Sequence, residues 1–345
     1  MLNSQVRLNS YPRDVVRADN FMLATDVPIR PLEAGEVLLQ VRYISVDPAM
    51  RIYMDPNSFI ASNPDLAHTF VRKGDIVRAW VVGEVVESRS AAFPVGSFAR
   101  DIGGGGGVQA YSIQNEAALA PADSELAPLE AYLGILGMVG LTAYAGLVEV
   151  GEPRPGDTLL VSGAAGGVGG IVGQIGKAMG CRVIGIAGGP EKCGHVTGFL
   201  GFDACIDHRA GSLDDALAQV CPDGIDIYFD NVGGKMLDAC LAHIRTRARI
   251  VACGAISAYQ GDVAPLRNHM HVLMRQARWE AFSSYEVYAD PLRFARAEAQ
   301  LAAWYGDGTL RAEHRVFDGL ENFVPALQAI YAGTTRGKVM LRLPH

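Results

Sequence analysis

The chain has 345 residues, of which 49% are hydrophobic and 19% are charged, and its formal net charge is −7. That composition is typical of a folded protein of about two domains and excludes an intrinsically disordered chain. The acidic balance also argues against general nucleic-acid binding, which needs a basic face.

The first part of the chain has the pattern of a β-rich domain, and it begins without the apolar core of a signal peptide. Runs rich in Val and Ile, at residues 37–46 and 75–88, are separated by Gly and Pro, as strands are. The glycine run Gly103–Gly107 predicts a loop. The apolar stretch 133–150 is interrupted by glycines and by polar residues, so it does not predict a membrane span. We therefore expect a cytoplasmic protein.

From Gly156 onward, short apolar runs alternate with helix-like stretches, which predicts a parallel sheet covered by helices on both faces. The expected strands are 158–162, 182–187, 204–207, 226–230 and 249–254, and the expected helices are 167–179, 190–200, 213–220 and 235–243. A last strand-like run at 338–343 predicts a strand that returns to the first domain. The expected fold is α/β, with a doubly wound domain over 126–309 and a discontinuous β-rich domain over 1–125 and 310–345.

The most informative motif is SGAAGGVGG at residues 162–170, which follows an expected strand and opens an expected helix. Ala164, Gly166 and Gly169 occupy the three small-residue positions of the dinucleotide fingerprint. Gly166 would let the backbone approach a pyrophosphate at the helix N-terminus, and Gly169 would let the helix pack closely on the strand. A tightly packed turn without a ligand shares this pattern, but the strand–turn–helix context favours a Rossmann cofactor site.

The residues after the second strand indicate which nicotinamide cofactor is used. An NAD site usually places a carboxylate at the end of that strand, but Ala187 is followed here by two glycines. Lys192 follows shortly after, and His208 and Arg209 follow the third strand. The missing carboxylate and these cations together favour the 2′-phosphate of NADPH. The alternative is that Lys192 is a solvated helix residue and Arg209 a surface charge.

The number and positions of the cysteines and histidines predict that no catalytic zinc is bound. Such a site needs three protein ligands, commonly Cys and His. The chain has no cysteine before Cys181, and His68 is the one histidine among residues 1–125. The six cysteines form no CxxC pair, so free thiols are expected.

Several segments that run nearly end to end match one family. They are VDPAMR (46–51), GMVGLTAYAGL (137–147), AAGGVG (164–169), GGPEK (188–192), GFD (201–203), YFDNVGG (228–234), CGAISAY (253–259), AF (281–282) and GLENFVPAL (319–327). On these residues the chain resembles the zinc-free medium-chain dehydrogenase/reductase superfamily. Within it, the chain is similar to the branch of prostaglandin reductase (leukotriene B4 12-hydroxydehydrogenase), plant alkenal double-bond reductase and bacterial curcumin reductase.

The resemblance implies a β-rich, groES-like catalytic domain, a Rossmann domain, a cleft between them, and a homodimer. It also implies NADPH contacts. These come from Gly166, Gly167, Val168 and Gly169 at the pyrophosphate, from Lys192 at the 2′-phosphate, and from Asn231, Cys253, Gly254, Ala255, Ile256, Ser257, Tyr259, Phe282, Ser283 and Ser284 along the nicotinamide half.

Departures from the family pattern concern the cofactor and the substrate. His208 stands where relatives usually have Tyr; it can still donate a hydrogen bond and adds charge when protonated. Thr335 replaces an Asn near the C-terminus, which puts that cofactor contact in doubt. Ala49 replaces a frequent aromatic residue, and Gly103–Gly107 replaces a segment richer in side chains. We expect the last two changes to widen the substrate pocket.

The expected reaction is hydride transfer from NADPH to the β-carbon of an α,β-unsaturated ketone or aldehyde, with Tyr259 donating a hydrogen bond to the enolate oxygen that develops. Packing on the cofactor is the alternative role for Tyr259, and forming a turn is the alternative role for Asn231. Two other functions stay open at this point. One is an NADPH quinone oxidoreductase, and the other is a non-catalytic NADPH-binding protein.

Overall fold

The computed structural model describes residues 1–64, 66–259 and 264–344. The chain divides into two compact units, Met1–Gly137 with His314–His345 (unit 1) and Met138–Glu313 (unit 2). Unit 1 holds a β-rich sheet and unit 2 a parallel Rossmann-type sheet, so the predicted fold class is confirmed. Within the described ranges, no helix is long and apolar enough to cross a membrane.

Unit 1 is built on a seven-stranded sheet in the order β14-β15-β3-β4-β5-β7, with β6 also paired to β3. Its strands are β3 (Glu36–Val46), β4 (Val81–Ser88), β5 (Phe98–Asp101), β6 (Tyr111–Asn115), β7 (Leu119–Pro121), β14 (His314–Asp318) and β15 (Lys338–Arg342). A separate antiparallel pair joins β1 (Leu2–Leu8) to β2 (Phe21–Pro28). The unit also contains the short α-helices α1 (Met50–Tyr53), α2 (Phe59–Ser62) and α11 (Phe323–Tyr331).

The core of unit 1 includes Val37, Leu39 and Val41, which alternate along β3 and so share one face of the sheet; Leu38 between them is buried as well. The C-terminal strand β15 lies antiparallel to β3 and parallel to β14. Residues from the two ends of the chain therefore share one hydrophobic core, which Phe323 and Leu327 of α11 help to fill.

Unit 2 is built on a six-stranded parallel sheet in the order β10-β9-β8-β11-β12-β13. The strands are β8 (Thr158–Ser162), β9 (Arg182–Ala187), β10 (Ala204–Asp207), β11 (Ile225–Asp230), β12 (Ile244–Ala252) and β13 (Arg278–Ala281). The helices are α3 (Met138–Tyr144), α4 (Gly167–Ala178), α5 (Pro190–Gly198), α6 (Leu213–Val220), α7 (Gly234–Ala242), α8 (Met270–Met274), α9 (Ser284–Ala289) and α10 (Pro291–Gly306).

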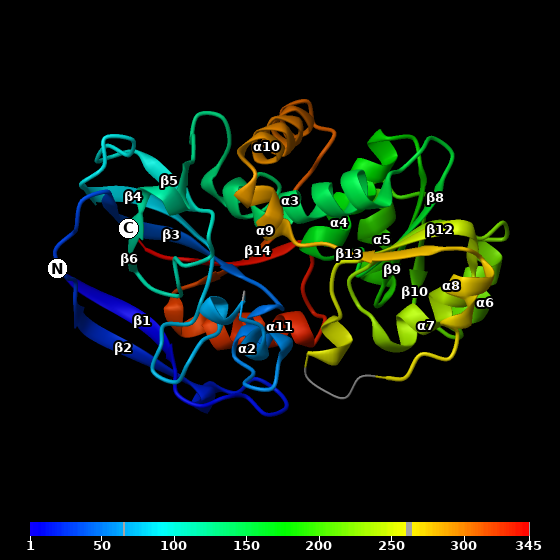
Figure 1. Ribbon diagram of the computed structural model, residues 1–345, viewed down its shortest axis with the longest axis horizontal. Coiled ribbons are helices and arrows are strands. Elements are labelled where there is room, and N and C mark those ends of the chain that lie inside the picture. The colour runs from blue at the N-terminus through cyan, green and yellow to red at the C-terminus, as the bar shows by residue number, and fades with distance from the viewer. Residues whose placement is uncertain (65, 260–263, 345) are drawn as a thin grey trace. The chain divides into compact units, whose positions relative to one another are not determined.

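The order of the strands makes this sheet doubly wound, because it runs outward from β8 to β10 on one side and from β11 to β13 on the other. Side chains of α6 and α7 share a core with one face of the sheet, including Leu160 and Ile184. Gly176 of α4 lies against the neighbouring residues Leu159 and Val183, which point to the opposite face. Figure 1 shows α4 and the group α6–α8 on different sides of these strands.

Candidate active site

The glycine-rich turn links β8 to α4 in a conformation that needs its glycines. Gly163 has a φ of +63°, and a Cβ on Gly169 would lie 2.4 Å from the backbone oxygen of Gly163. The first backbone hydrogen bond of α4 runs from the amide of Gly170 to the carbonyl oxygen of Gly166. The amides of residues 167 to 169 therefore have no acceptor inside the helix. Those amides at a helix N-terminus are suited to bind an anion such as a pyrophosphate.

A second turn, between β9 and α5, brings together cationic side chains. A Cβ on Gly188 would lie 2.8 Å from Nε of Arg209 and 2.9 Å from Nε2 of His208, so both side chains close over this turn. Lys192 lies in the first turn of α5. The structure therefore places the three predicted 2′-phosphate ligands in unit 2, around the carboxyl ends of β9 and β10.

The same turn depends on Asp207, a residue that the sequence did not single out. Its Oδ1 accepts hydrogen bonds from the amides of Gly189 at 2.8 Å and Arg209 at 3.0 Å. These hydrogen bonds lower the pKa of Asp207, so its carboxylate stays ionised and bound to backbone donors. Its position as the last residue of the third strand is the signal that could have identified it.

His208 does not carry the charge that protonation would give it. Loss of hydration and then the charge of Arg209 lower the pKa of His208 from its ordinary value of 6.5. The imidazole is therefore neutral in the free protein at pH 7, and it would act there as a hydrogen-bonding group.

The end of β11 is organised by the buried carboxylate of Asp230. Its Oδ1 accepts hydrogen bonds from the hydroxyls of Tyr228 at 2.8 Å and Ser162 at 3.0 Å. The amides of Val232 and Gly233 donate to the same oxygen, each at 3.0 Å. Burial nevertheless raises the pKa of Asp230, because it outweighs these hydrogen bonds. The network fixes the backbone of the YFDNVGG segment.

Asn231 is held against the end of β8. Its Nδ2 donates to the backbone oxygen of Ser162 at 2.7 Å, and its amide donates to Oγ of Ser162 at 2.8 Å. Forming this turn was the alternative role considered for Asn231, and the geometry supports it directly.

The segment after β12 is joined to the same turn. The amides of Cys253 and Gly254 donate to the backbone oxygen of Asp230 at 2.9 and 3.0 Å. The Oγ of Ser257 donates to the backbone oxygen of Val232 at 2.7 Å. Burial raises the pKa of Cys253 to about 12, so its thiol is neutral. The structure thus brings the predicted segments 228–234 and 253–259 together.

Tyr259 has the geometry of a hydrogen-bond donor. Its hydroxyl oxygen accepts a hydrogen bond from the amide of Ala255 at 3.2 Å, which leaves the hydroxyl hydrogen available for another acceptor. Burial raises the pKa of Tyr259 above 10.0, so the phenol is protonated at neutral pH. The half-buried side chain can therefore donate a hydrogen bond or a proton.

The remaining predicted cofactor residues lie outside these turns. The ring of Phe282 packs edge-on against Phe229, with 6.4 Å between ring centroids, and a Cβ on Gly146 would lie 2.5 Å from it. Ser283 and Ser284 follow at the start of α9. Thr335 belongs to unit 1, in the loop between α11 and β15, while all the other predicted cofactor residues belong to unit 2.

The glycine run in unit 1 is a packed loop. The amides of Gly103, Gly104 and Gly106 all donate to the carboxylate of Asp101, at 2.8 to 2.9 Å. A Cβ on Gly104 would lie 2.8 Å from the Trp80 ring. Burial raises the pKa of Asp101 to about 6, and sequence reasoning missed this residue. We still only predict that the Gly103–Gly107 run widens a substrate pocket.

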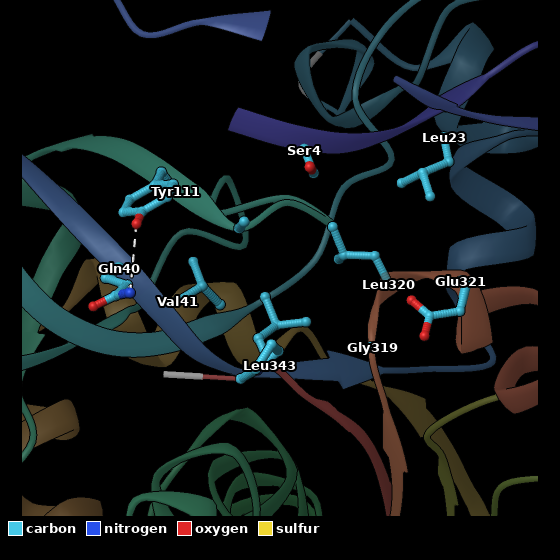
Figure 2. Close-up of a pocket in the computed structure, with 11 residues that line it drawn as sticks. Ser4, Leu23, Gln40, Val41, Tyr111, Gly319, Leu320, Glu321 and Leu343 are labelled. Atoms are coloured by element: carbon cyan, nitrogen blue, oxygen red, sulfur yellow. Dashed lines mark hydrogen bonds between the residues drawn. The ribbon is translucent and has the colours of Figure 1, made fainter. Parts of the chain in front are cut away.

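A cavity of about 380 Å³ lies in unit 1 (Figure 2). Its walls include Val41, Leu320 and Glu321, together with Gln40, whose Nε2 donates to the Tyr111 hydroxyl at 3.4 Å. No predicted site residue lines this cavity, so we do not assign the reaction to it.

Among the residues that the structure describes, no group of three or more His, Cys, Asp or Glu side chains is arranged to hold a metal ion. The prediction that the protein works without zinc still needs a solution experiment.

Comparison with known proteins identifies the family. The family described as "N-terminal domain of oxidoreductase" matches residues 4–121, and the one described as "Zinc-binding dehydrogenase" matches residues 167–300. The NADPH-dependent curcumin reductase of Escherichia coli is 36% identical over 342 residues, which cover 97% of this chain and 95% of that protein. The chain belongs to the medium-chain dehydrogenase/reductase superfamily, in the branch of the curcumin and prostaglandin reductases.

Two further relatives support this assignment. Prostaglandin reductase 1 of Bos taurus is 34% identical over 330 residues, which cover 94% of each chain. The crystal structure of CurA from Vibrio vulnificus in complex with NADPH is similar with a TM-score of 0.89 and 36% identity, over 99% of each chain. The resemblance drawn from the sequence motifs is therefore confirmed.

Proposed function

We propose that this protein is an NADPH-dependent reductase that saturates the carbon–carbon double bond of α,β-unsaturated ketones and aldehydes. One observation carries the proposal: relatives that match almost the whole chain at 34–36% identity are named as NADPH-dependent curcumin reductase and prostaglandin reductase. The residues of unit 2 support it independently, as follows.

The cofactor fits the residues that are present. The free amides at the start of α4 suit the pyrophosphate, and Gly166 leaves room for its approach, while Gly169 lets the helix pack against the turn. Lys192, Arg209 and the neutral His208 suit the 2′-phosphate. The nearby carboxylate of Asp207 is bound to backbone amides and needs no contact with the ligand. These residues would hold NADPH, which supplies a hydride when it is bound.

Catalysis in this proposal depends on Tyr259. As the β-carbon of the substrate accepts a hydride, negative charge develops on the carbonyl oxygen, and a donor placed there lowers the barrier. The Tyr259 hydroxyl is protonated and has a hydrogen left to donate. Asp230 and Asn231 are positioning residues. Their hydrogen bonds fix the turn after β11, and that turn accepts hydrogen bonds from the 253–259 segment.

We also propose a homodimer that works in the cytoplasm without a metal ion. The edge strand β13 is exposed along its whole length, Trp279 on it is 41% exposed, and Met274 nearby is 74% exposed. An open edge beside apolar side chains suits pairing with a second copy. All six cysteines are free thiols, as is usual for a reducing compartment.

The test is a spectrophotometric NADPH-oxidation screen that covers enals, enones, quinones and saturated ketones. We expect turnover with enones and enals and little with saturated ketones. Faster turnover with quinones than with every enone would replace the proposal by a quinone oxidoreductase. Tight NADPH binding without oxidation across the panel would replace it by a non-catalytic NADPH-binding protein.

A further inference from the structure

Two cysteines of unit 2 lie with their sulfur atoms in contact. Sγ of Cys205 and Sγ of Cys193 are 2.9 Å apart, although the residues are 12 positions apart in the sequence. A disulfide bond needs about 2.05 Å between the sulfurs, so a relative shift of about 0.9 Å would suffice. Both residues are partly accessible, as Cys253 also is, whereas Cys181, Cys221 and Cys240 are buried. Contact and access make this pair chemically different from the other thiols.

The pair joins the two elements that carry the proposed 2′-phosphate ligands. Cys193 directly follows Lys192 in α5, and Cys205 lies in β10, which continues into His208 and Arg209. β10 is an edge strand of the sheet, with α5 packed against it. A change at the sulfurs therefore alters the spacing between Lys192 and the residues that close over Gly188.

We propose that Cys193 and Cys205 are a redox-modification site. They form a reversible disulfide, which weakens binding of the 2′-phosphate of NADPH by unit 2. The disulfide itself is independent of the function proposed above, while its effect on NADPH rests on that function. Cytosolic disulfides of this kind are usually transient and regulatory.

The chemistry is a thiol–disulfide exchange with a low-molecular-weight disulfide such as glutathione disulfide. The Cys193 thiolate attacks one sulfur of the oxidant, forms a mixed disulfide and releases one glutathione thiolate. The Cys205 thiol then loses its proton and attacks Sγ of Cys193, which expels the second glutathione thiolate. Two protein thiols are oxidised, one glutathione disulfide is reduced, and the two protons pass to the released thiolates.

The order of these steps follows from the surroundings of the two sulfurs. Burial, and then the hydrogen bond to Cys193, raise the pKa of Cys205, which makes it the weaker first nucleophile. Once a mixed disulfide has formed on Cys193, the neighbouring Cys205 is already in contact and competes well against a second glutathione.

The effect on the cofactor follows from geometry. Closing the gap by about 0.9 Å is enough to lengthen one hydrogen bond to a phosphate oxygen. We expect the dissociation constant for NADPH to rise about three- to tenfold, the change that follows from weakening one such bond. By linkage, saturating NADPH must make the disulfide harder to form by the same factor.

The first test follows the disulfide directly. The full chain is equilibrated with glutathione buffers of increasing oxidised fraction, quenched with N-ethylmaleimide in denaturant so that buried thiols also react, and digested without reductant for mass spectrometry. We expect peptides containing Cys193 and Cys205 to become linked, with a loss of about 2 Da per bond, while Cys221 and Cys240 stay alkylated. Mixed disulfides alone, or free thiols at both positions in the most oxidising buffer, would overturn the proposal.

The second test separates the effect on NADPH from the proposed function. Binding of NADPH and of NADH is measured by calorimetry for the reduced and oxidised protein and for the matched variants Cys193→Ser and Cys205→Ser. Oxidation should weaken NADPH binding in the wild type and leave NADH binding unchanged, and it should not change NADPH binding by Cys193→Ser. Cys205→Ser should stop at the mixed disulfide with glutathione on Cys193, so its oxidised form is identified by mass before its binding is compared. An equal loss for both cofactors, or no loss, would refute the coupling. If the reduced protein binds no NADPH, the proposed function fails, and peptide mapping still decides whether the disulfide forms.

Discussion

Replacing Gly169 by Ala tests whether the glycine turn is built as the structure indicates. The added Cβ would lie 2.4 Å from the backbone oxygen of Gly163 and 2.9 Å from its carbonyl carbon. Ordinary contact for a Cβ begins at 3.4 Å, so the start of α4 and the turn must separate by about 1 Å. Both atoms that are overlapped belong to the backbone, so no side chain can rotate to relieve the contact.

The size of the overlap sets the expected losses of stability and of NADPH affinity. Overpacking of this kind costs about 1–3 kcal/mol in the free energy of unfolding. For a domain of the size of unit 2, each kcal/mol lowers the melting temperature by about 2–4 °C, so we expect a fall of about 2–12 °C. The same shift displaces the amides at the start of α4. Loss of one charge-assisted hydrogen bond should raise the dissociation constant for NADPH about ten- to a hundredfold.

The assay is thermal unfolding followed by calorimetric titration with NADPH, with Gly194→Ala as the matched control. Gly194 lies inside α5, is exposed, and a Cβ there meets nothing within 4 Å. That variant should gain about 0.5–1 kcal/mol of stability and keep its NADPH affinity. A Gly169→Ala protein with the melting temperature and NADPH affinity of the wild type would refute the close approach of helix and turn.

Four other predictions test the site and its surroundings. Tyr259→Phe should lower kcat with an enone about ten- to a thousandfold while the NADPH dissociation constant stays constant, and an unchanged kcat would remove Tyr259 from the mechanism. Lys192→Ala should weaken NADPH binding about ten- to a hundredfold and NADH binding little, whereas Lys177→Ala, which only breaks an exposed ion pair with Asp203, should change neither. Excess chelator should leave turnover unchanged, and one zinc per chain required for activity would contradict this. Because burial raises the pKa of Asp101 to about 6 from 3.8, the folded protein keeps a proton that the unfolded chain releases. The contribution of Asp101 to stability should therefore fall as the pH rises from about 4 to 6, and the difference in urea midpoint between the wild type and Asp101→Asn should change over this range.

Much of unit 2 could be predicted because its signals are local. Continuous apolar strands, each followed by an amphipathic stretch, placed the strands β8 to β11 to within a residue, and the glycines of 162–170 have a physical reason visible in the sequence. β12 was less well placed. It begins at Ile244, where the polar residues of IRTRAR hid the strand, and its expected start was Arg249. β13 is short and exposed throughout, so it carried no continuous run of apolar residues.

The remaining features were harder to read from the sequence because they depend on the shapes of turns and on how a helix packs against a strand. Asp101 and Asp207 are ordinary carboxylates until the fold directs several backbone amides at each of them. The Cys193–Cys205 contact joins a helix to the strand that follows it, and its spacing matches no motif of paired cysteines. At Asp101 the chemistry arises from a turn, and at the cysteine pair it arises from a helix packed against a strand. No local sequence pattern specifies either arrangement.

The most direct test of the central claim is the fate of a labelled hydride. The protein is supplied with NADPH deuterated at the position that transfers hydride, together with an enone, and the product is examined by mass spectrometry and NMR. Our account predicts a saturated ketone with one deuterium on the former β-carbon. Deuterium on the carbonyl carbon of an allylic alcohol would contradict it, because the protein would then be a carbonyl reductase.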